Sequence, residues 1–324
     1  MTNEFNSRID LSPLHQGVQR LRSELQKVVV GQHALIDNLI VSVLSNGHAL
    51  IEGVPGVAKT LSAKLLAHSI SSGFSRIQFT PDLMPSDILG TSVFNQKTTE
   101  FEFKQGPIFS NLILIDEINR APAKTQAALF EVMEERQITL DGRQYNMQLP
   151  FLVFATQNPI EQEGTYRLPE AQLDRFMMKI EVAYPTDQEE LLILKSHHTR
   201  TNNNPLAGIE RVISGQEVLE YQHLVRQVHA EESLLQYITA IVTQTRNFSG
   251  LYLGASPRAS FWLLQAAKAK AAIAGRDFIT PDDVQHMAFP VLRHRIMLTP
   301  DKEMEGSNTN EVIKQILEKI EVPR

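Results

Sequence analysis

Short apolar runs recur along the first part of the chain, and segments with helical periodicity separate them. Each run is too short to form a helix and suits a buried strand. The runs are Ala49 to Ile51, Ile77 to Phe79, Leu112 to Ile115, Phe151 to Ala155 and Ile180 to Val182. This alternation predicts an α/β domain built on a parallel five-stranded sheet.

The pattern changes after Tyr184-Pro185. Strand-like runs disappear from the sequence, and helical stretches rich in Leu, Ala, Gln and Glu occupy most of the remainder. Two of these helices are expected to start at Ser256-Pro257 and Thr280-Pro281, because Ser or Thr followed by Pro is typical of a helix N-cap and first turn. We therefore predict an α/β core over residues 1–185 and a smaller all-α domain over residues 186–324.

The segment from Gly53 to Thr60 has the character of a phosphate-binding loop between a strand and a helix. Gly53 and Gly56 allow a tight turn whose N–H groups point inward at an anion. Lys59 supplies a positive charge for the β- and γ-phosphates, and Thr60 a hydroxyl ligand for Mg²⁺. Ala58 stands where the GxxxxGK[ST] pattern has its second Gly. The alternative interpretation is a Gly/Pro turn before a helix that happens to carry Lys-Thr.

Two carboxylates, Asp116 and Glu117, end the apolar run that begins at Leu112. An unpaired charge at the end of a buried strand is costly, so we expect a cation nearby. Beside a phosphate loop, Asp116 is suited to hold Mg²⁺, directly or through water, and Glu117 to polarise the attacking water. An acidic strand-to-loop turn without catalytic function is the weaker alternative.

Three further polar side chains are candidates for the same site. Asn158 follows the fourth apolar run, at the edge of a parallel sheet where ligands bind, and could orient the attacking water. The alternative is a simple turn, because Asn-Pro commonly starts one. Arg258 lies in the first turn of a predicted helix, where the positive end of the helix dipole disfavours a cation. A contact with the γ-phosphate of a nucleotide would remove this penalty, and exposure to solvent would do so too. In a ring-shaped assembly, Arg175 is a candidate arginine finger for the neighbouring nucleotide, with Arg167 and Arg120 as substitutes, whereas an internal Asp174–Arg175 salt bridge is the alternative.

Two segments interrupt the α/β alternation. Residues 81–110 contain Pro, Gly and an alternating stretch from Phe101 to Lys104, which indicates a hairpin or ribbon. Residues 137–149 contain Asp141-Gly142, the strongest short-range hairpin signal. Both are equally compatible with decorative surface loops, but their position beside the candidate nucleotide elements favours a functional role.

Composition narrows the classes of protein to consider. The chain has 324 residues, of which 42% are hydrophobic and 21% charged, as is ordinary for a globular protein. No apolar run approaches the roughly 20 residues that span a bilayer, and the polar N-terminus is unlike a signal peptide, so we expect a cytoplasmic protein without membrane insertion. The absence of cysteine excludes disulfides and thiolate catalysis, and a net charge of −6 argues against a general nucleic-acid binder.

Taken together, these motifs resemble the MoxR family of AAA+ ATPases. The resemblance lies in GVPGVAKT at 53–60, LILIDEINRAP at 112–122, ATQNP at 155–159, LPEAQLDRF at 168–176 and GASPRA at 254–259. It implies an AAA+ core with a helical lid, in which Ala before the loop lysine is usual. It further implies that Asn158 and Arg258 are sensors one and two, that Arg175 is the finger acting on a neighbouring subunit, and that both inserts face the centre of a ring. The nucleotide-binding set implied is Val30, Gly31, Gln32, Gly53, Val54, Pro55, Gly56, Val57, Ala58, Lys59, Thr60 and Leu61.

The function implied is ATP hydrolysis with Mg²⁺ at the subunit interfaces of a ring, expected to be a hexamer. Proteins that this chain resembles act as chaperone-like ATPases that remodel, mature or metallate a client protein, often beside a von Willebrand A-type partner. Three alternatives remain: a nucleic-acid motor or clamp-loader-like ATPase, a magnesium-chelatase-like subunit, and a small-molecule kinase. The inserts carry Lys97, Lys104 and Arg143 against Asp82, Asp87, Glu100, Glu102 and Asp141, so the sequence shows no basic track and nucleic acid is the less favoured ligand.

Overall fold

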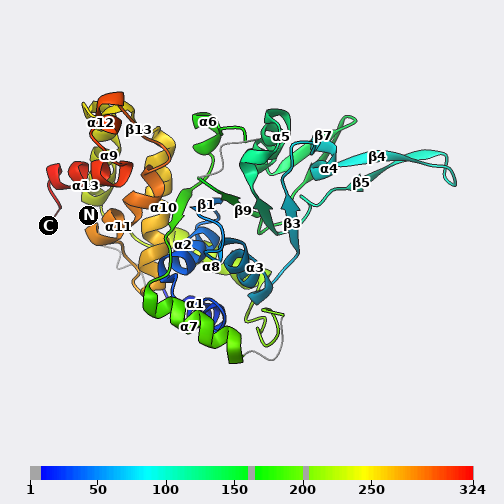
Figure 1. Ribbon diagram of the computed structural model, residues 1–324, viewed down its shortest axis with the longest axis horizontal. Helices are drawn as coiled ribbons and strands as arrows, with labels where there is room; N and C mark the ends of the chain where they lie inside the picture. Colours follow the sequence, from blue (N-terminus) through cyan, green and yellow to red (C-terminus); the bar gives the residue numbers. More distant parts are fainter. Residues whose placement is uncertain (1–8, 160–164, 200–203, 324) are drawn as a thin grey trace, which may run out of the picture.

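The computed structural model describes residues 9–159, 165–199 and 204–323. Its centre is a five-stranded sheet in which every neighbouring pair of strands is parallel, in the order β10-β1-β9-β6-β3 (Figure 1). The strands are β1 (Ala49–Gly53), β3 (Phe74–Gln78), β6 (Leu112–Asp116), β9 (Leu152–Gln157) and β10 (Met178–Val182). The predicted α/β fold with a parallel five-stranded sheet is therefore confirmed.

Helices cover both faces of this sheet. Alternate residues of β6 point to opposite sides: Leu112 and Leu114 join one hydrophobic cluster, while Ile113 and Ile115 join another. The first cluster contains α1 (Ser12–Gln26), α2 (His33–Leu44) and α3 (Lys59–Ser69), and the second contains α4 (Pro85–Leu89) and α5 (Ala123–Glu135). The inner strands β1, β6 and β9 are buried on both faces, which explains why their sequences are apolar runs rather than alternating ones.

The rest of the chain is mainly helical, but not entirely. Its helices are α7 (Asp187–Thr199), α8 (Gly215–Gln227), α9 (Glu232–Asn247), α10 (Pro257–Ile273), α11 (Pro281–Leu292), α12 (Pro300–Met304) and α13 (Thr309–Lys319). Ser256 and Thr280 are the N-cap residues of α10 and α11, so both predicted helix starts are confirmed. The expectation of an all-α second domain needs correction, because β12 (Leu251–Leu253) pairs with β13 (Met297–Leu298) and β11 (Ile213–Ser214) pairs with β2 (Ile70–Ser71). The latter pair begins directly after α3 ends at Ser69, because the backbone of β2 enters a strand ladder there.

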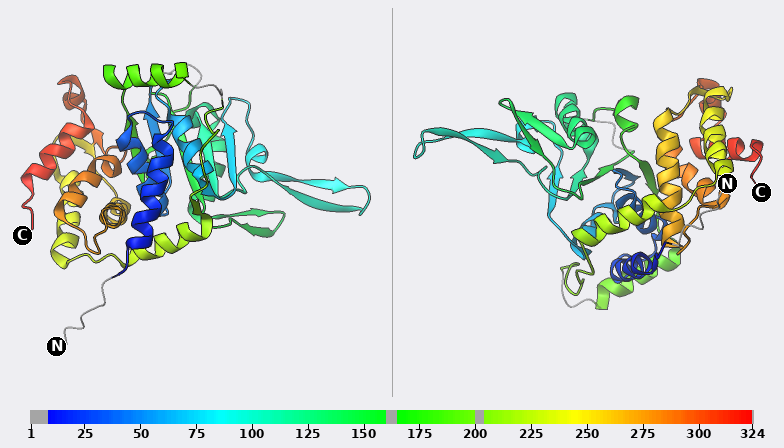
Figure 2. Two further views of the ribbon diagram at one scale, coloured as in Figure 1. Left: turned by 90° about the horizontal axis from the view of Figure 1, so that it is seen from below. Right: turned by 180° about the vertical axis from the view of Figure 1, so that it is seen from behind.

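Both inserts are hairpins. β4 (Gly90–Asn95) pairs with β5 (Glu100–Gln105), and β7 (Gln137–Leu140) pairs with β8 (Arg143–Asn146). Asp141 and Gly142 have φ angles of 50° and 73°, as a tight two-residue hairpin turn requires. Figure 2 shows both hairpins projecting from the same end of the molecule. They touch one another, since the Ser92 hydroxyl donates to Asp141 Oδ2 at 2.5 Å.

The two parts of the chain share a hydrophobic core. The hydrophobic cluster that covers one face of the sheet continues through α8, α10 and α11. The packing is therefore continuous across residue 185, and the domain boundary placed there stays a prediction. Arg295, after α11, is 5% exposed and binds the segment before β10: its Nε donates to Asp174 Oδ1 at 2.7 Å and its guanidinium to the carbonyl oxygen of Met177 at 2.9 Å. Because removing one partner of a buried ion pair costs several kcal/mol, these contacts fix the position of the helical part against the sheet.

A buried histidine at the start of β1 gives the fold a pH dependence. His48 Nδ1 accepts a hydrogen bond from the Val153 N–H at 2.9 Å, and Nε2 lies 3.2 Å from the Met133 carbonyl oxygen, so the neutral ring fits its site. Burial, and secondarily the charge of Arg136, lowers the pKa of His48 to about 4 from the ordinary 6.5.

The unfolded chain therefore binds a proton between pH 6.5 and 4 that the native state does not bind, and stability falls as the pH falls through this range. We expect the free energy of unfolding to drop by about 2 kcal/mol from His48 alone between pH 7.5 and 5. Urea titrations at the two pH values measure it. The His48→Gln variant should lose this part of the slope, whereas His223→Gln, at an exposed position, should keep it; equal slopes for wild type and His48→Gln would contradict the assignment.

Candidate nucleotide site

The loop between β1 and α3 has the backbone of an anion-binding turn. Gly56 has a φ of +88°, and a β-carbon on Gly53 would lie 2.7 Å from the Val182 carbonyl oxygen, so Gly53 is required by close packing against β10. Ala58 is the N-cap residue of α3 and has a left-handed φ of 63°. An alanine there costs about 1 kcal/mol or more relative to glycine, and such strain is typical of functional loops. Ala58 therefore adopts the left-handed backbone conformation that the glycine of the pattern adopts readily.

Lys59 and Thr60 open α3 directly beneath this loop. The Lys59 ammonium donates to the carbonyl oxygens of Gly53 and, at 3.3 Å, Gln157. The Thr60 hydroxyl donates to Asp116 Oδ1 at 2.7 Å. A hydroxyl and a carboxylate in contact at a helix N-terminus fit Mg²⁺, which usually takes few protein ligands and completes its shell with phosphate oxygens and waters.

Asp116 is 4% exposed and has the cationic partner that its burial demands. Arg76, on β3, places Nε 2.6 Å from Asp116 Oδ2. On the other side, the Thr156 hydroxyl contacts Asp116 Oδ1 at 3.2 Å and accepts from the Glu117 N–H at 3.1 Å. The cation expected from the sequence is therefore present, in a residue that the sequence did not single out.

Glu117 leaves the strand in a left-handed conformation, with a φ of 57°. Its Oε2 accepts from Gln78 Nε2 at 2.8 Å and from Arg120 at 2.9 Å. Arg120, one of the substitute finger candidates, therefore lies on the carboxylate of its own chain. Both donors bind Oε2 and so orient the carboxylate of the candidate water-activating residue.

Asn158 reaches the same edge because of the strand order. β9 lies between β1 and β6, so the residue that follows its end is placed between the phosphate loop and the two carboxylates. Asn158 is 7% exposed. The structure brings Lys59, Thr60, Asp116, Glu117 and Asn158 together at the carboxyl edge of the sheet, where ligands bind in parallel α/β folds.

The segment Val30 to Gln32 borders this edge. Gln32 Nε2 donates to the Ala183 carbonyl oxygen at 3.0 Å, just after β10. A β-carbon on Gly31, which has a φ of +65°, would lie 2.2 Å from Glu189 Oε1, so this loop packs closely on the first turn of α7. These contacts place the candidate adenine-binding residues next to Val182, the partner of Gly53 across the sheet.

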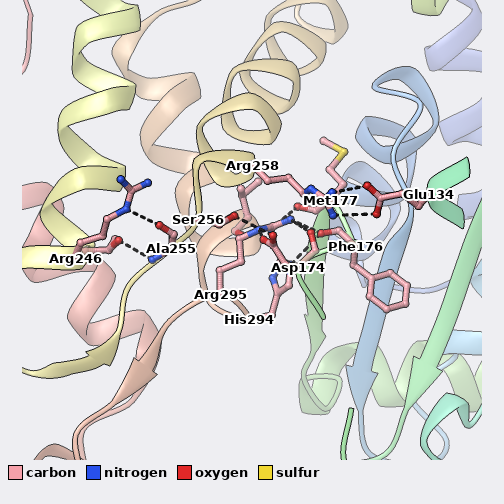
Figure 3. Close-up of polar contacts among 12 residues, drawn as sticks. Glu134, Asp174, Phe176, Met177, Arg246, Ala255, Ser256, Arg258, His294 and Arg295 are labelled. Carbon is pink, nitrogen blue, oxygen red and sulfur yellow. Dashed lines mark hydrogen bonds and ion pairs between the residues drawn. The ribbon is translucent and has the colours of Figure 1, made fainter. Parts of the chain in front are cut away.

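The remaining two candidates, Arg175 and Arg258, lie together at the opposite edge. Arg175 Nε is 3.2 Å from Glu134 Oε2, and Arg258 binds the same carboxylate at 2.5 Å (Figure 3). Asp174 is bound by Arg295 and by the Ser256 hydroxyl, at 2.7 and 2.9 Å. Asp174 and Arg175 do not pair with each other, but each forms a salt bridge within the chain, with Arg295 and Glu134, so the alternative of an internal salt bridge holds with different partners.

The location of this pair changes the expected role of Arg258. Residues Asn46 and His48, which precede β1, line the same hollow as Glu134, Arg175 and Arg258. The five residues of β1 separate this edge from Gly53, which amounts to about 15 Å of sheet. Arg258 is thus placed away from the phosphate loop of its own chain, and its contact with a γ-phosphate bound in that loop finds no support in this geometry. Arg167, the other substitute finger, contacts Glu170 at 3.8 Å.

Four residues that carry this arrangement were not found by reading the sequence: Arg76, Gln78, Glu134 and Arg295. Arg76 lies beside Ile77, the one buried residue of β3, and a cation next to a buried strand position is a usable signal for a carboxylate partner. Glu134 and Arg295 carry no local signal, because their partners lie 41 or more residues away in Arg175 and Asp174.

Two features are absent from residues 9–159, 165–199 and 204–323, which the structure describes. These residues contain no helix long and apolar enough to cross a membrane. They contain no group of three or more His, Cys, Asp or Glu side chains arranged to hold a metal.

Comparisons with known proteins agree with this geometry. Residues 48–178 match the family described as ATPase family associated with various cellular activities, and residues 243–316 match an AAA lid domain. The chain is 42% identical to Chaperone MoxR1 of Mycobacterium tuberculosis over 95% of this chain and 82% of that protein, and 44% identical to YeaC of Bacillus subtilis over 96% of both. A crystal structure of a candidate ATPase from Cytophaga hutchinsonii superposes with a TM-score of 0.88 at 43% identity, covering 97% of each chain. The chain belongs to the MoxR family of AAA+ ATPases.

Proposed function

We propose that this protein hydrolyses ATP to ADP and phosphate at a site shared between two copies of the chain. The observation that carries the proposal is the contact between Thr60 and Asp116, 2.7 Å apart, which joins the phosphate loop to the carboxylate strand in one Mg²⁺-competent site. Glu117, beside it, is the proposed base, and Asn158 orients the water. The bound Mg²⁺ would neutralise charge on the phosphate oxygens.

The second half of the site is supplied by another copy. Arg175 and Arg258 lie at the edge opposite to the phosphate loop, where they cannot stabilise charge on their own nucleotide. A head-to-tail contact between copies brings one edge against the other and closes into a ring when repeated. We propose a hexamer in which both arginines leave Glu134 for the γ-phosphate held by the neighbour.

We further propose that hydrolysis drives chaperone-like work on a client protein, through the β4–β5 and β7–β8 hairpins. The relative named a chaperone supports this step, as does the exposed aromatic pair of Phe94 and Phe101, which are 50% and 71% exposed on β4 and β5. Maturation or metallation of the client, and a von Willebrand A-type partner, follow from the family resemblance alone. The hairpins carry charges of both signs, which do not favour a nucleic-acid motor.

Capture of a client tests this step. The Glu117→Gln variant with ATP should retain proteins from a native lysate, whereas Lys59→Ala, which weakens ATP binding, should retain few; peptide mass spectrometry compares the two. A further Phe94→Ser and Phe101→Ser change should remove the captured set. Capture that is equal with and without ATP, or turnover that rises with added DNA and falls steeply with salt, would contradict the chaperone proposal.

A further inference from the structure

A second hollow lies directly beside the arginine pair. It has a volume of about 300 Å³ and is lined by Leu44, Ser45, Asn46, Arg136, Gln222, Arg226, Phe261, Trp262 and Gln265. On α10, the lining residues Phe261, Trp262 and Gln265 follow Arg258 at spacings of three, four and seven, so they share its face of the helix. A surface that meets Arg258 in an assembly therefore also meets this hollow.

The hollow contains polar groups without partners. Asn46 Oδ1, Gln222 Oε1 and Trp262 Nε1 are buried and make no hydrogen bond within the part of the chain that the structure describes. Buried polar groups are normally paired, so three in one hollow point to a bound partner or ordered water.

The hollow is also positively charged, because Arg136 and Arg226 line it. The Arg136 guanidinium donates to the Asn46 carbonyl oxygen and Arg226 to that of Gln222, but neither binds a carboxylate among the described residues. The two cations act on each other, since burial and then the charge of Arg226 lower the pKa of Arg136. Phe261, 54% exposed, stands at this site with its ring 5.0 Å from that of Trp262. The surface that fits is thus both acidic and apolar.

One element of this chain, α7, has that composition and exposes its apolar residues. Along α7, the consecutive residues Leu191, Leu192, Ile193 and Leu194 are 51%, 51%, 39% and 63% exposed. None of them belongs to the three hydrophobic clusters of the described residues. The first turn of α7 is acidic, with Asp187, Glu189 and Glu190. A helix that is apolar on most sides is normally buried, and a contiguous exposed apolar patch marks an interaction surface.

We propose that α7 of one copy binds in the Arg136–Trp262 hollow of the next. This inference rests on the proposed shared site. α7 begins five residues after Val182, which pairs with Gly53, so it lies at the phosphate-loop edge. The contact that delivers Arg258 to a neighbouring nucleotide therefore also brings the hollow towards that neighbour's α7. Asp187 and Glu190 then compensate Arg136 and Arg226, while Leu191 and Leu194, one turn apart, cover Phe261 and Trp262.

The same contact links assembly to the nucleotide. Glu189 of α7 packs against Gly31, in the loop proposed to border the adenine. Binding of ATP at this loop would order the first turn of α7 and so present its apolar surface to the neighbour. Assembly is expected to be stronger with ATP than without it.

Disulfide trapping tests the contact, because the chain has no cysteine of its own. The single variants Leu194→Cys and Phe261→Cys are mixed with a non-hydrolysable ATP analogue and oxidised. We expect a covalent dimer of unlike chains, at a yield at least about tenfold above a control mixture of Met304→Cys and Phe261→Cys; Met304 is 80% exposed on α12. No excess over the control overturns the proposal. A fast, concentration-independent link within the Leu194→Cys/Phe261→Cys double variant also overturns it, because the hollow would then take α7 of the same chain.

Assembly of the full chain gives a second readout. Leu191→Ser with Leu194→Ser should raise the protein concentration needed for half assembly by about 100-fold, measured by sedimentation with the ATP analogue. Met304→Ser is the matched control. Arg226→Glu should weaken assembly about fivefold, and Glu190→Arg in the same chain should restore it. Unchanged assembly in the leucine variant overturns the proposal for α7. If copies assemble and hydrolyse ATP without the disulfide, this inference alone fails; if the disulfide forms without hydrolysis, the proposed function fails.

Discussion

Glu117→Gln is expected to lower ATP turnover by about 10²- to 10⁴-fold while leaving ATP affinity nearly unchanged, because the amide keeps the size of the side chain but cannot accept a proton. The structure favours this separation of effects. Glu117 lies beside Asp116 but is held by Gln78 and Arg120, not by Lys59 or Thr60. Its loss should therefore leave the phosphate loop intact.

Lys59→Ala is the matched comparison, with the opposite expectation. The lysine lies inside the loop, where it contacts the Gly53 and Gln157 carbonyl oxygens, and removing its charge should weaken ATP binding about 10- to 100-fold. Fluorescent nucleotide titration and steady-state phosphate release measure the two quantities. Normal hydrolysis by either variant, or lost affinity in Glu117→Gln, would contradict the assignment of the site.

The inner strands of the sheet were predictable from the sequence because they are buried on both faces. A short continuous apolar run such as Leu112 to Ile115 is typical of a buried strand, and the carboxylate of Asp116 at its end marks the ligand edge. The hairpin at Asp141-Gly142 was predictable for a local reason, since both residues adopt positive φ. Such features depend on neighbours in sequence.

The position of Arg258 was not predictable in this way. Its helix start at Ser256-Pro257 is local, but the edge of the sheet that it faces is set by distant contacts. Arg295 holds Asp174 across 121 residues, and Arg258 meets Glu134 across 124. No periodicity or cap encodes such pairs. Arg175 was singled out from the sequence as a candidate arginine finger, a role that stays a prediction, and its distant partner Glu134 was not found.

Arg175→Ala is expected to lower turnover by about 10³-fold or more without changing ATP affinity, because a finger stabilises charge that develops only in the transition state. Arg258→Ala should behave in the same way, but less severely. Both side chains share Glu134, so each substitution leaves that carboxylate with one cation and the fold intact. Glu134→Gln is the matched control, since it releases both arginines without removing either charge.

Mixing two inactive variants tests the shared site most directly. Lys59→Ala has an intact arginine edge, and Arg175→Ala has an intact phosphate-loop edge. In rings assembled from equal amounts, half of the chains have an intact phosphate-loop edge and the other half an intact arginine edge. About one interface in four then joins two intact edges, so the mixture should reach about a quarter of the wild-type rate. Phosphate release measured across mixing ratios should peak at equal proportions. Activity that stays at the level of the separate variants at every ratio would contradict a site completed by a second copy.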